Sequence, residues 1–107
     1  HFITQIKAQD LSGSSSSGFI YGVAYADGYW MVGGQYYDGS ADSARIAYAT
    51  SLDGTWTIKD VWSGNESAVR CVAYADENWV VGGLAYDGST YSAHVSYAIN
   101  PDSFITE

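Results

Sequence analysis

Two stretches of this sequence, Tyr37–Ser40 and Tyr86–Ser89, both read Tyr-Asp-Gly-Ser. A tyrosine ring can stack on the apolar face of a sugar, and a carboxylate accepts hydrogen bonds from sugar hydroxyls. The residue types therefore predict a site for a neutral carbohydrate. The alternative is that Asp-Gly only forms a hairpin turn, with no ligand. The candidate ligand-binding residues are Tyr37, Asp38, Tyr86, Asp87 and Tyr91.

The other reactive residue types form no recognisable catalytic or metal-binding pattern. Asp38–Ser43 is rich in oxygen ligands, but it lacks the spacing and the final Glu of a calcium-binding EF-hand loop. His94 falls within a strand-like segment, and no Ser, His and Asp follow a catalytic order. The single cysteine, Cys71, excludes an internal disulfide and is expected to be a small buried residue. We expect no enzyme activity, metal ion or cofactor.

Composition excludes several classes of partner. The 107 residues fit one domain, and 12 acidic against 4 basic residues give a net charge of −8. The few Lys and Arg are scattered, whereas binding to nucleic acid or to an anionic membrane needs them clustered. No apolar stretch is long enough to span a membrane. A carbohydrate-binding module of this kind is expected outside the cell or at its surface.

The elements that position the candidate site come from an internal repeat. Val23–Ala49 recurs 49 residues later as Val72–Ala98, with 17 of 27 positions identical. Tyr, Val, Trp and Ile dominate each copy and glycines interrupt it, which is typical of strands and turns. The predicted strands of the first copy are Phe19–Ala26, Tyr29–Tyr36, Ala44–Thr50 and Trp56–Trp62. Those of the second are Val69–Ala75, Trp79–Ala85, Ala93–Ile99 and a truncated Ser103–Glu107.

Four antiparallel strands in each 49-residue unit are typical of a β-propeller blade. The sequence therefore predicts an all-β fold of two four-stranded antiparallel blades, residues 18–64 and 65–107, within one unit of 107 residues. His1–Asp10 is expected to add an outer strand to a blade. The glycine pairs Gly33-Gly34 and Gly82-Gly83 are expected to let a neighbouring blade pack closely. The repeated aromatic residues expected between blades are Trp30, Trp79, Tyr25, Tyr74, Tyr48 and Tyr97.

The segment Ser51–Trp56 resembles the Asp-box motif, Ser-x-Asp-x-Gly-x-Thr-Trp, of sialidase-like propellers, with one residue missing between Asp53 and Gly54 and one between Gly54 and Thr55. The second copy keeps only Asn100, Asp102 and Phe104. The resemblance implies a six-bladed fold in which the box is a structural turn, its Asp bonded to local backbone and its Trp packed between sheets. Sialidase activity would also need a clamp of three arginines. This chain has two, of which Arg70 is expected near a central channel.

Two blades are fewer than a propeller needs, and they would leave apolar faces open to water. We therefore expect copies of the chain to close a homo-oligomeric ring, a trimer of six blades being favoured over a dimer or tetramer. The chain would then be a lectin-like module with repeated weak sites. The alternatives are a structural scaffold without a small-molecule ligand, natural or engineered, and a fragment of a longer glycan-acting enzyme.

Overall fold

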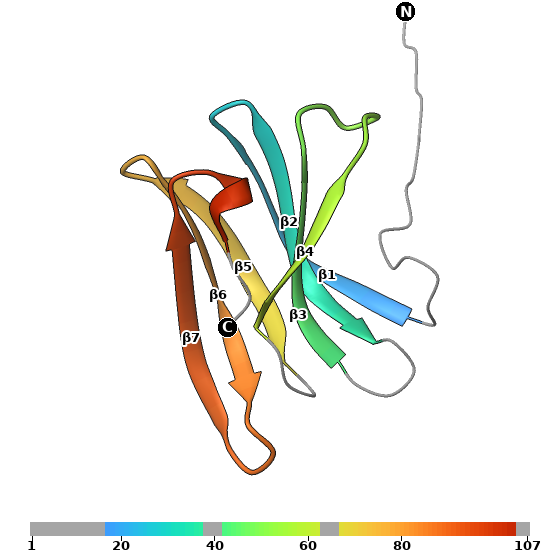
Figure 1. Ribbon diagram of the computed structural model, residues 1–107, viewed down its shortest axis with the longest axis vertical. Helices are drawn as coiled ribbons and strands as arrows, with labels where there is room; N and C mark the ends of the chain where they lie inside the picture. The colour runs from blue at the N-terminus through green and yellow to red at the C-terminus, as the bar shows by residue number, and fades with distance from the viewer. Residues whose placement is uncertain (1–16, 38–41, 63–66, 105–107) are drawn as a thin grey trace, which may run out of the picture.

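The computed structural model describes residues 17–37, 42–62 and 67–104, which form seven strands in two antiparallel sheets (Figure 1). The strand order is β1-β2-β3-β4 in the first sheet and β5-β6-β7 in the second. The strands are β1 (Ser17–Ala26), β2 (Tyr29–Tyr37), β3 (Asp42–Ala49), β4 (Thr57–Trp62), β5 (Ala68–Ala75), β6 (Asn78–Tyr86) and β7 (Tyr91–Ala98). Each lies within two residues of its predicted bounds, and the all-β prediction is confirmed.

The second sheet differs from the first at its outer edge, where the described residues form three strands rather than four. The predicted strand Ser103–Glu107 is wrong at Ser103 and Phe104, because Pro101–Ser103 forms a 3-10 turn, η1, and Phe104 follows it outside any strand. Proline fixes φ at about −65° and has no N–H to donate, which suits the first turn of a helix better than a strand. Residues 105–107 and the predicted outer strand His1–Asp10 lie outside the described residues.

Tight turns join the first two strands of each sheet. Asp27 and Gly28 connect β1 to β2 with φ values of 51° and 83°, and Asp76 and Glu77 connect β5 to β6 with 52° and 63°. Positive φ at both central residues matches the twist of the paired strands. Glycine adopts this conformation without steric cost, whereas Glu77 does so against the clash of its Cβ with the backbone.

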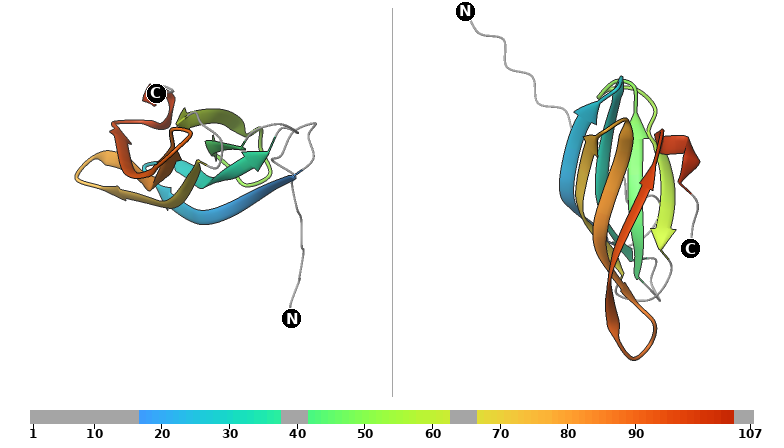
Figure 2. Two further views of the ribbon diagram at one scale, coloured as in Figure 1. Left: turned by 90° about the horizontal axis from the view of Figure 1, so that it is seen from below. Right: turned by 90° about the vertical axis from the view of Figure 1, so that its left-hand side faces the viewer.

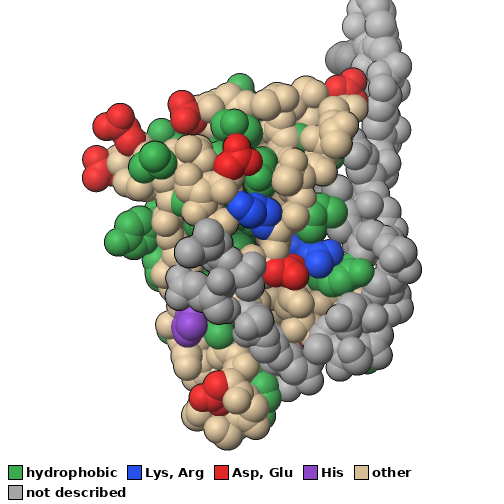
Figure 3. All heavy atoms as spheres, viewed as in Figure 1, with side chains coloured by type: hydrophobic (Ala, Val, Ile, Leu, Met, Phe, Trp, Pro, Cys, Tyr) green, Lys and Arg blue, Asp and Glu red, His purple; other side chains and the backbone are tan. Residues whose placement is uncertain are grey.

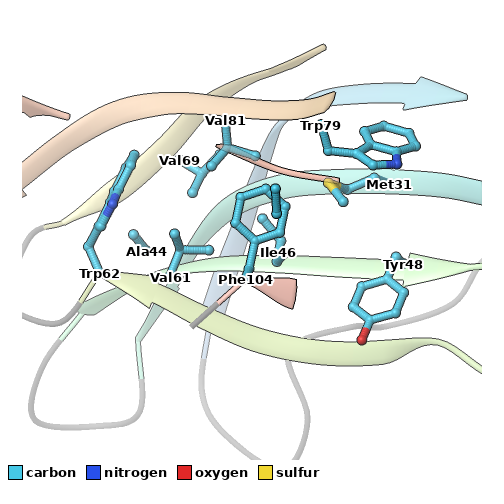
Figure 4. Close-up of a cluster of buried hydrophobic side chains, with 11 residues drawn as sticks. Met31, Ala44, Ile46, Tyr48, Val61, Trp62, Val69, Trp79, Val81 and Phe104 are labelled. Carbon is cyan, nitrogen blue, oxygen red and sulfur yellow. The ribbon is translucent and has the colours of Figure 1, made fainter. Parts of the chain in front are cut away.

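The two sheets are neighbouring layers, with β5 packed against β1, β2 and β3 (Figure 2). The first strands of the sheets, β1 and β5, lie side by side, which gives the pair a blade-like arrangement. Trp62 of β4, Trp79 of β6 and Phe104 fill the space between the layers (Figure 4). The rest of the buried cluster is aliphatic or tyrosine: Met31, Ala44, Ile46, Tyr48, Val61, Val69, Val81 and Ala98.

Gly33 allows the two layers to approach closely, as its sequence position predicts. A Cβ atom there would overlap the side chain of Val69 and lie 2.8 Å from Cγ2 of Val72. The second glycine of each pair has a different role from the predicted one. A Cβ on Gly34 would overlap the carbonyl of Phe19, and one on Gly83 that of Ala68. Glycine is needed at both positions because the adjacent strand shifts its register there and brings its backbone close.

The two sheets have the same orientation in the stack. The 49-residue repeat therefore places equivalent residues on corresponding faces of the two sheets. We call the face of the first sheet that carries Met31, Ile46 and Tyr48 its back face; it packs on the second sheet. The second sheet contributes its front face to this contact, with Trp79 buried and Tyr74 packed beside it. Two faces therefore stay open: the front face of the first sheet and the back face of the second.

The aromatic residues expected between blades divide according to this stacking. Trp79, Tyr74 and Tyr48 lie between the two sheets, and Trp30 is half-buried on the open front face. In the single chain Tyr25 is 57% exposed and Tyr97 is 72% exposed, so their place between blades stays a prediction that depends on assembly. Each occupies the position of a core residue on a face that nothing in the described part of the chain covers.

Candidate functional site

Two of the predicted ligand-binding tyrosines face each other at the closed end of the β6–β7 hairpin. Tyr86 ends β6, Tyr91 begins β7, and the register pairs them. Their ring centroids are 4.6 Å apart at an interplanar angle of 38°, and Tyr91 is 55% exposed. The Tyr86 hydroxyl donates a 3.0 Å hydrogen bond to the carbonyl oxygen of Gly88. The pair forms a small aromatic surface fixed by the strand ladder.

The third member of this hairpin, Asp87, is engaged within its own turn. Its Oδ1 accepts hydrogen bonds from the backbone N–H groups of Ser89 at 3.0 Å and Thr90 at 2.9 Å. The hydroxyls of the same two residues also donate to it. The backbone bonds from Thr90 and Ser89 hold the pKa of Asp87 below its ordinary value of 3.8. The ionised carboxylate of Asp87 therefore holds this turn in its conformation.

The first sheet does not repeat the aromatic pair. Tyr37 is the equivalent of Tyr86, but its partner across the strands is Asp42, where the second sheet has Tyr91. Tyr37 is the last residue of β2, and this strand points toward the end of the molecule where the β6–β7 turn lies (Figure 1). The remaining predicted residue, Asp38, lies outside the described residues. The structure thus brings together Tyr86, Asp87 and Tyr91 in one hairpin and leaves Tyr37 on another.

The two arginines are held separately, each over a tyrosine ring. The guanidinium carbon of Arg45 lies 3.6 Å from the ring centroid of Tyr36, and its Nε donates to Asp60 Oδ1 at 2.9 Å. Arg70 lies 4.4 Å from the ring centroid of Tyr21. Figure 3 shows no large basic patch on the face that it presents. These partners give each arginine a structural role and form no clamp for a carboxylate.

A polar contact between the sheets was not found by sequence reasoning. The hydroxyl of Tyr48 donates to Oδ1 of Asp102 at 2.5 Å, and Lys59 Nζ donates to the Asp102 carbonyl at 2.7 Å. Burial, followed by the bond to Asp102 and its negative charge, raises the pKa of Tyr48 to about 12. The only sequence signal was that Asp102 falls where the second repeat would have the Asp of an Asp-box-like motif, which gave no indication of its partner.

A second contact of this kind joins the far end of the sheets. The indole Nε1 of Trp62 donates to Ser96 Oγ at 2.9 Å, and the Trp62 ring meets His94 edge-to-face with centroids 5.4 Å apart. His94 is therefore used in packing, in agreement with its predicted place within a strand.

The segment Ser51–Trp56, which resembles an Asp box in sequence, lies in the connection between β3 and β4, and Trp56 is not part of the buried cluster between the sheets. The backbone N–H of Gly54 donates to the carbonyl of Ser51 at 3.2 Å, and the Trp56 indole donates to the carbonyl of Leu52 at 3.2 Å. Asp53 is exposed. The segment thus organises its own loop, and these contacts assign it no chemistry.

Comparison with protein-family models, with curated proteins and with solved structures finds no match to this chain. In residues 17–37, 42–62 and 67–104, no three His, Cys, Asp or Glu side chains are grouped so that they could hold a metal ion. The same ranges contain no helix of the length and hydrophobicity needed to cross a membrane.

Cys71 corrects one further prediction, because the structure places it on the surface rather than in the core. It lies on the open back face of the second sheet, opposite Gly82. Its Sγ is 3.7 Å from the Gly82 carbonyl oxygen. The apolar segment around Cys71 suggested burial, but this strand position faces away from the first sheet.

Proposed function

We propose that this chain is a non-enzymatic β-propeller module that binds a neutral carbohydrate at the β6–β7 hairpin. The observation that supports this proposal is the tilted ring pair of Tyr86 and Tyr91, with Tyr91 more than half exposed. A sugar presents C–H groups on one face of its ring, and an aromatic surface can cover them at low entropic cost. The strand ladder keeps the two rings in place before a ligand arrives.

Asp87 has a supporting role in this proposal. Its Oδ1 is occupied by the turn, so the carboxylate acts first by fixing the hairpin that carries the rings. Its charge disfavours anionic sugars near the hairpin, as does the net charge of −8. The separate placement of Arg45 and Arg70 also supports a neutral ligand.

Titration with neutral mono- and oligosaccharides, followed by NMR shifts of the hairpin amides, tests the proposal. Tyr91→Ala should weaken binding by about ten-fold, because it removes the exposed ring. Tyr91→Phe keeps the ring and should bind nearly as well as the unaltered chain. Tyr21→Ala, which removes an exposed tyrosine of β1, is the matched control and should leave binding unchanged. Binding that survives Tyr91→Ala, or no binding of any neutral sugar, would contradict the proposal.

A second candidate function is a self-assembling scaffold whose product is the ring itself. The two open faces favour it, because they expose Val23, Tyr25, Val95 and Tyr97, which a single chain leaves in contact with water. Light scattering tests it: a scaffold has a mass that is a multiple of 11.5 kDa. A clean ring that ignores every sugar would favour the scaffold over the carbohydrate-binding module.

A further inference from the structure

We propose that the open back face of the second sheet binds the open front face of the first sheet of another copy. The contact would have the register that joins the two sheets within one chain. This inference names the partner and the contacts for self-assembly, and it does not depend on carbohydrate binding.

The contact inside the chain is the template for this interface. There, the back face of the first sheet presents Gly33, and Val69 and Val72 from the second sheet pack over it. The repeat of 49 residues makes Gly82 the equivalent of Gly33, and Ile20 and Val23 the equivalents of the two valines. In a single chain these equivalents lie on opposite outer faces, so only a second copy can bring them together.

Among the described residues, only atoms of its own sheet lie near Gly82. A Cβ atom there would meet Cys71 Sγ at 3.1 Å and the carbonyl oxygen of His94 at 3.8 Å. Ile20 and Val23 are exposed on the other open face, and the latter is 60% exposed. One face thus has a glycine that Cys71 partly covers and no other sheet reaches, and the other face has the two side chains whose equivalents pack over the matching glycine within the chain.

Other positions of the two faces match the template, except that Cys71 stands where the template has Gly22, so the strand of the other copy must lie slightly farther away there. Val95 and Tyr97 occupy the positions of Ile46 and Tyr48, which are buried against the second sheet. Within the chain Tyr48 bonds to Asp102, and 49 residues earlier stands Asp53, which is exposed. The same register would therefore place the Tyr97 hydroxyl of one copy beside Asp53 of the next. The inner contact would be repeated in both its apolar and its polar parts.

Charge does not oppose this contact. The strand residues of the open back face are uncharged: Cys71, Ala73, Val80, Val95 and Tyr97. The open front face presents Ile20, Val23, Tyr25, Trp30 and Val32, and toward β4 it also carries Arg45 and Asp60, which form an ion pair at 2.9 Å. In a chain of net charge −8, the two faces can therefore meet without repulsion between uncompensated charges on their strands. A head-to-tail contact of this kind closes into a ring or extends into a filament.

Gly82→Val is the decisive substitution, because its side chain rises from the open face, where only the Cys71 side chain of its own sheet has to shift to make room. By light scattering we expect the unaltered chain to have at least twice the 11.5 kDa mass of one copy. Gly82→Val should weaken association at least ten-fold while circular dichroism stays unchanged. Glu77→Gly, in a turn outside both faces, is the control and should keep the oligomer. An unaltered chain that stays single at high concentration, or a Gly82→Val oligomer of undiminished strength, would overturn the inference.

Disulfide trapping provides a test if Gly82→Val folds poorly. Within the chain a Cβ on Gly33 would lie 3.2 Å from Cβ of Val69, close to the separation that a disulfide requires. In a Cys71→Ser background, Ile20→Cys with Gly82→Cys should therefore form disulfides between copies under mild oxidation, seen as dimers and larger species. Ile20→Cys alone should give only slow, nonspecific dimers. Oligomers that form without this cross-link would show assembly through another surface, and would overturn the inference while leaving the scaffold function intact.

The thiol of Cys71 gives a third readout in the unaltered chain. Gly22, its equivalent, is covered by β5, with a would-be Cβ 3.3 Å from the Cα of Cys71. In the assembly the corresponding strand of another copy should cover Cys71. We expect its reaction with a thiol reagent to slow at least ten-fold between dilute and concentrated protein. The same rate at both concentrations would contradict burial of this face.

Discussion

The hydroxyl of Tyr48 and the carboxylate of Asp102 are 2.5 Å apart, although 54 residues separate them in the sequence. This bond joins the back face of the first sheet to the η1 turn of the second. Lys59 of β4 donates to the backbone carbonyl of the same aspartate. The polar contact thus complements the apolar one between the layers, at the edge of the core where one partner meets water.

Tyr48→Phe should lower the free energy of unfolding by about 1–2 kcal/mol, as expected for loss of a hydrogen bond to a charged group. The ring stays in the core, so no cavity forms. Asp102 is exposed, and water can hydrate its carboxylate once the hydroxyl is gone. Urea denaturation measures the change. Tyr21→Phe is the control, because its exposed hydroxyl bonds to neutral Gln35 at 3.3 Å and should matter little. Equal losses in the two variants would contradict the assigned bond.

Alkaline pH should weaken the fold through the same residue. Burial and the neighbouring Asp102 raise the pKa of Tyr48 from 10.0 to about 12. The folded state therefore holds this proton more tightly than the unfolded state does. The contribution of protonated Tyr48 to stability is therefore fully present below pH 10 and is lost as the pH rises through about 12. Ultraviolet absorbance of the phenolate should show a late-titrating tyrosine that is missing from Tyr48→Phe. An unchanged titration curve in that variant would argue against this assignment.

Removal of the Asp87 carboxylate should loosen the β6–β7 turn. Asp87→Ala should speed hydrogen exchange at the amides of Ser89 and Thr90, whereas Asp87→Asn keeps an acceptor oxygen and should speed it less. Because the bonds from these amides lower the pKa of Asp87, its contribution is present above the ordinary value of 3.8. It is lost as the pH falls through the lower folded-state pKa. NMR exchange measurements check both effects, and unchanged exchange in Asp87→Ala would contradict them.

Glu77→Gly should stabilise the chain by roughly 1 kcal/mol, because Glu77 has a φ of 63°, where an L-residue strains against its own backbone. The matched reverse change is Gly28→Ala in the other turn. Gly28 has a φ of 83°, and a Cβ there would touch nothing within 4 Å, so any loss is conformational. Thermal denaturation should show opposite shifts. Shifts of the same sign would contradict the role of φ in these turns.

Gly33→Ala should destabilise the chain by about 1–3 kcal/mol, because its Cβ overlaps the side chain of Val69 across the core. Val69→Ala alone should also destabilise, by leaving a cavity. The double variant gives the new methyl group room, and its loss should be smaller than the sum of the two. Chemical denaturation of the four proteins measures this coupling. Simple additivity would show that the two residues do not meet.

Local features of the fold were predictable from the sequence. Alternating apolar residues and the turns expected at Asp27-Gly28 and Asp76-Glu77-Asn78 predicted the strand limits within two residues, because both signals act over a few neighbours. The need for Gly33 was also predictable as a close approach. The role of Gly34 was not, because it depends on a register shift in the strand beside it.

The candidate site was predictable as residue types and only partly as geometry. The sequence placed Tyr86, Asp87 and Tyr91 in one hairpin, but the pairing of the two rings depends on their register. The use of the Asp87 carboxylate inside its own turn appeared only with the positions of Ser89 and Thr90. The contact between Tyr48 and Asp102 crosses two sheets, and neither residue has a local signal for it.

Tyr48 and Tyr97 separate what the sequence determined from what the tertiary structure decided. Both stand in the same repeat position on a β-strand, so the sequence gives them the same local conformation and the same face of their sheet. Yet Tyr48 is 5% exposed and Tyr97 is 72% exposed. Burial depends on whether another sheet lies above the residue. In this chain the second sheet covers the back face of the first, whereas none of the described residues covers the back face of the second. The repeat therefore determined the shape of each face, and the stacking order determined which face meets water.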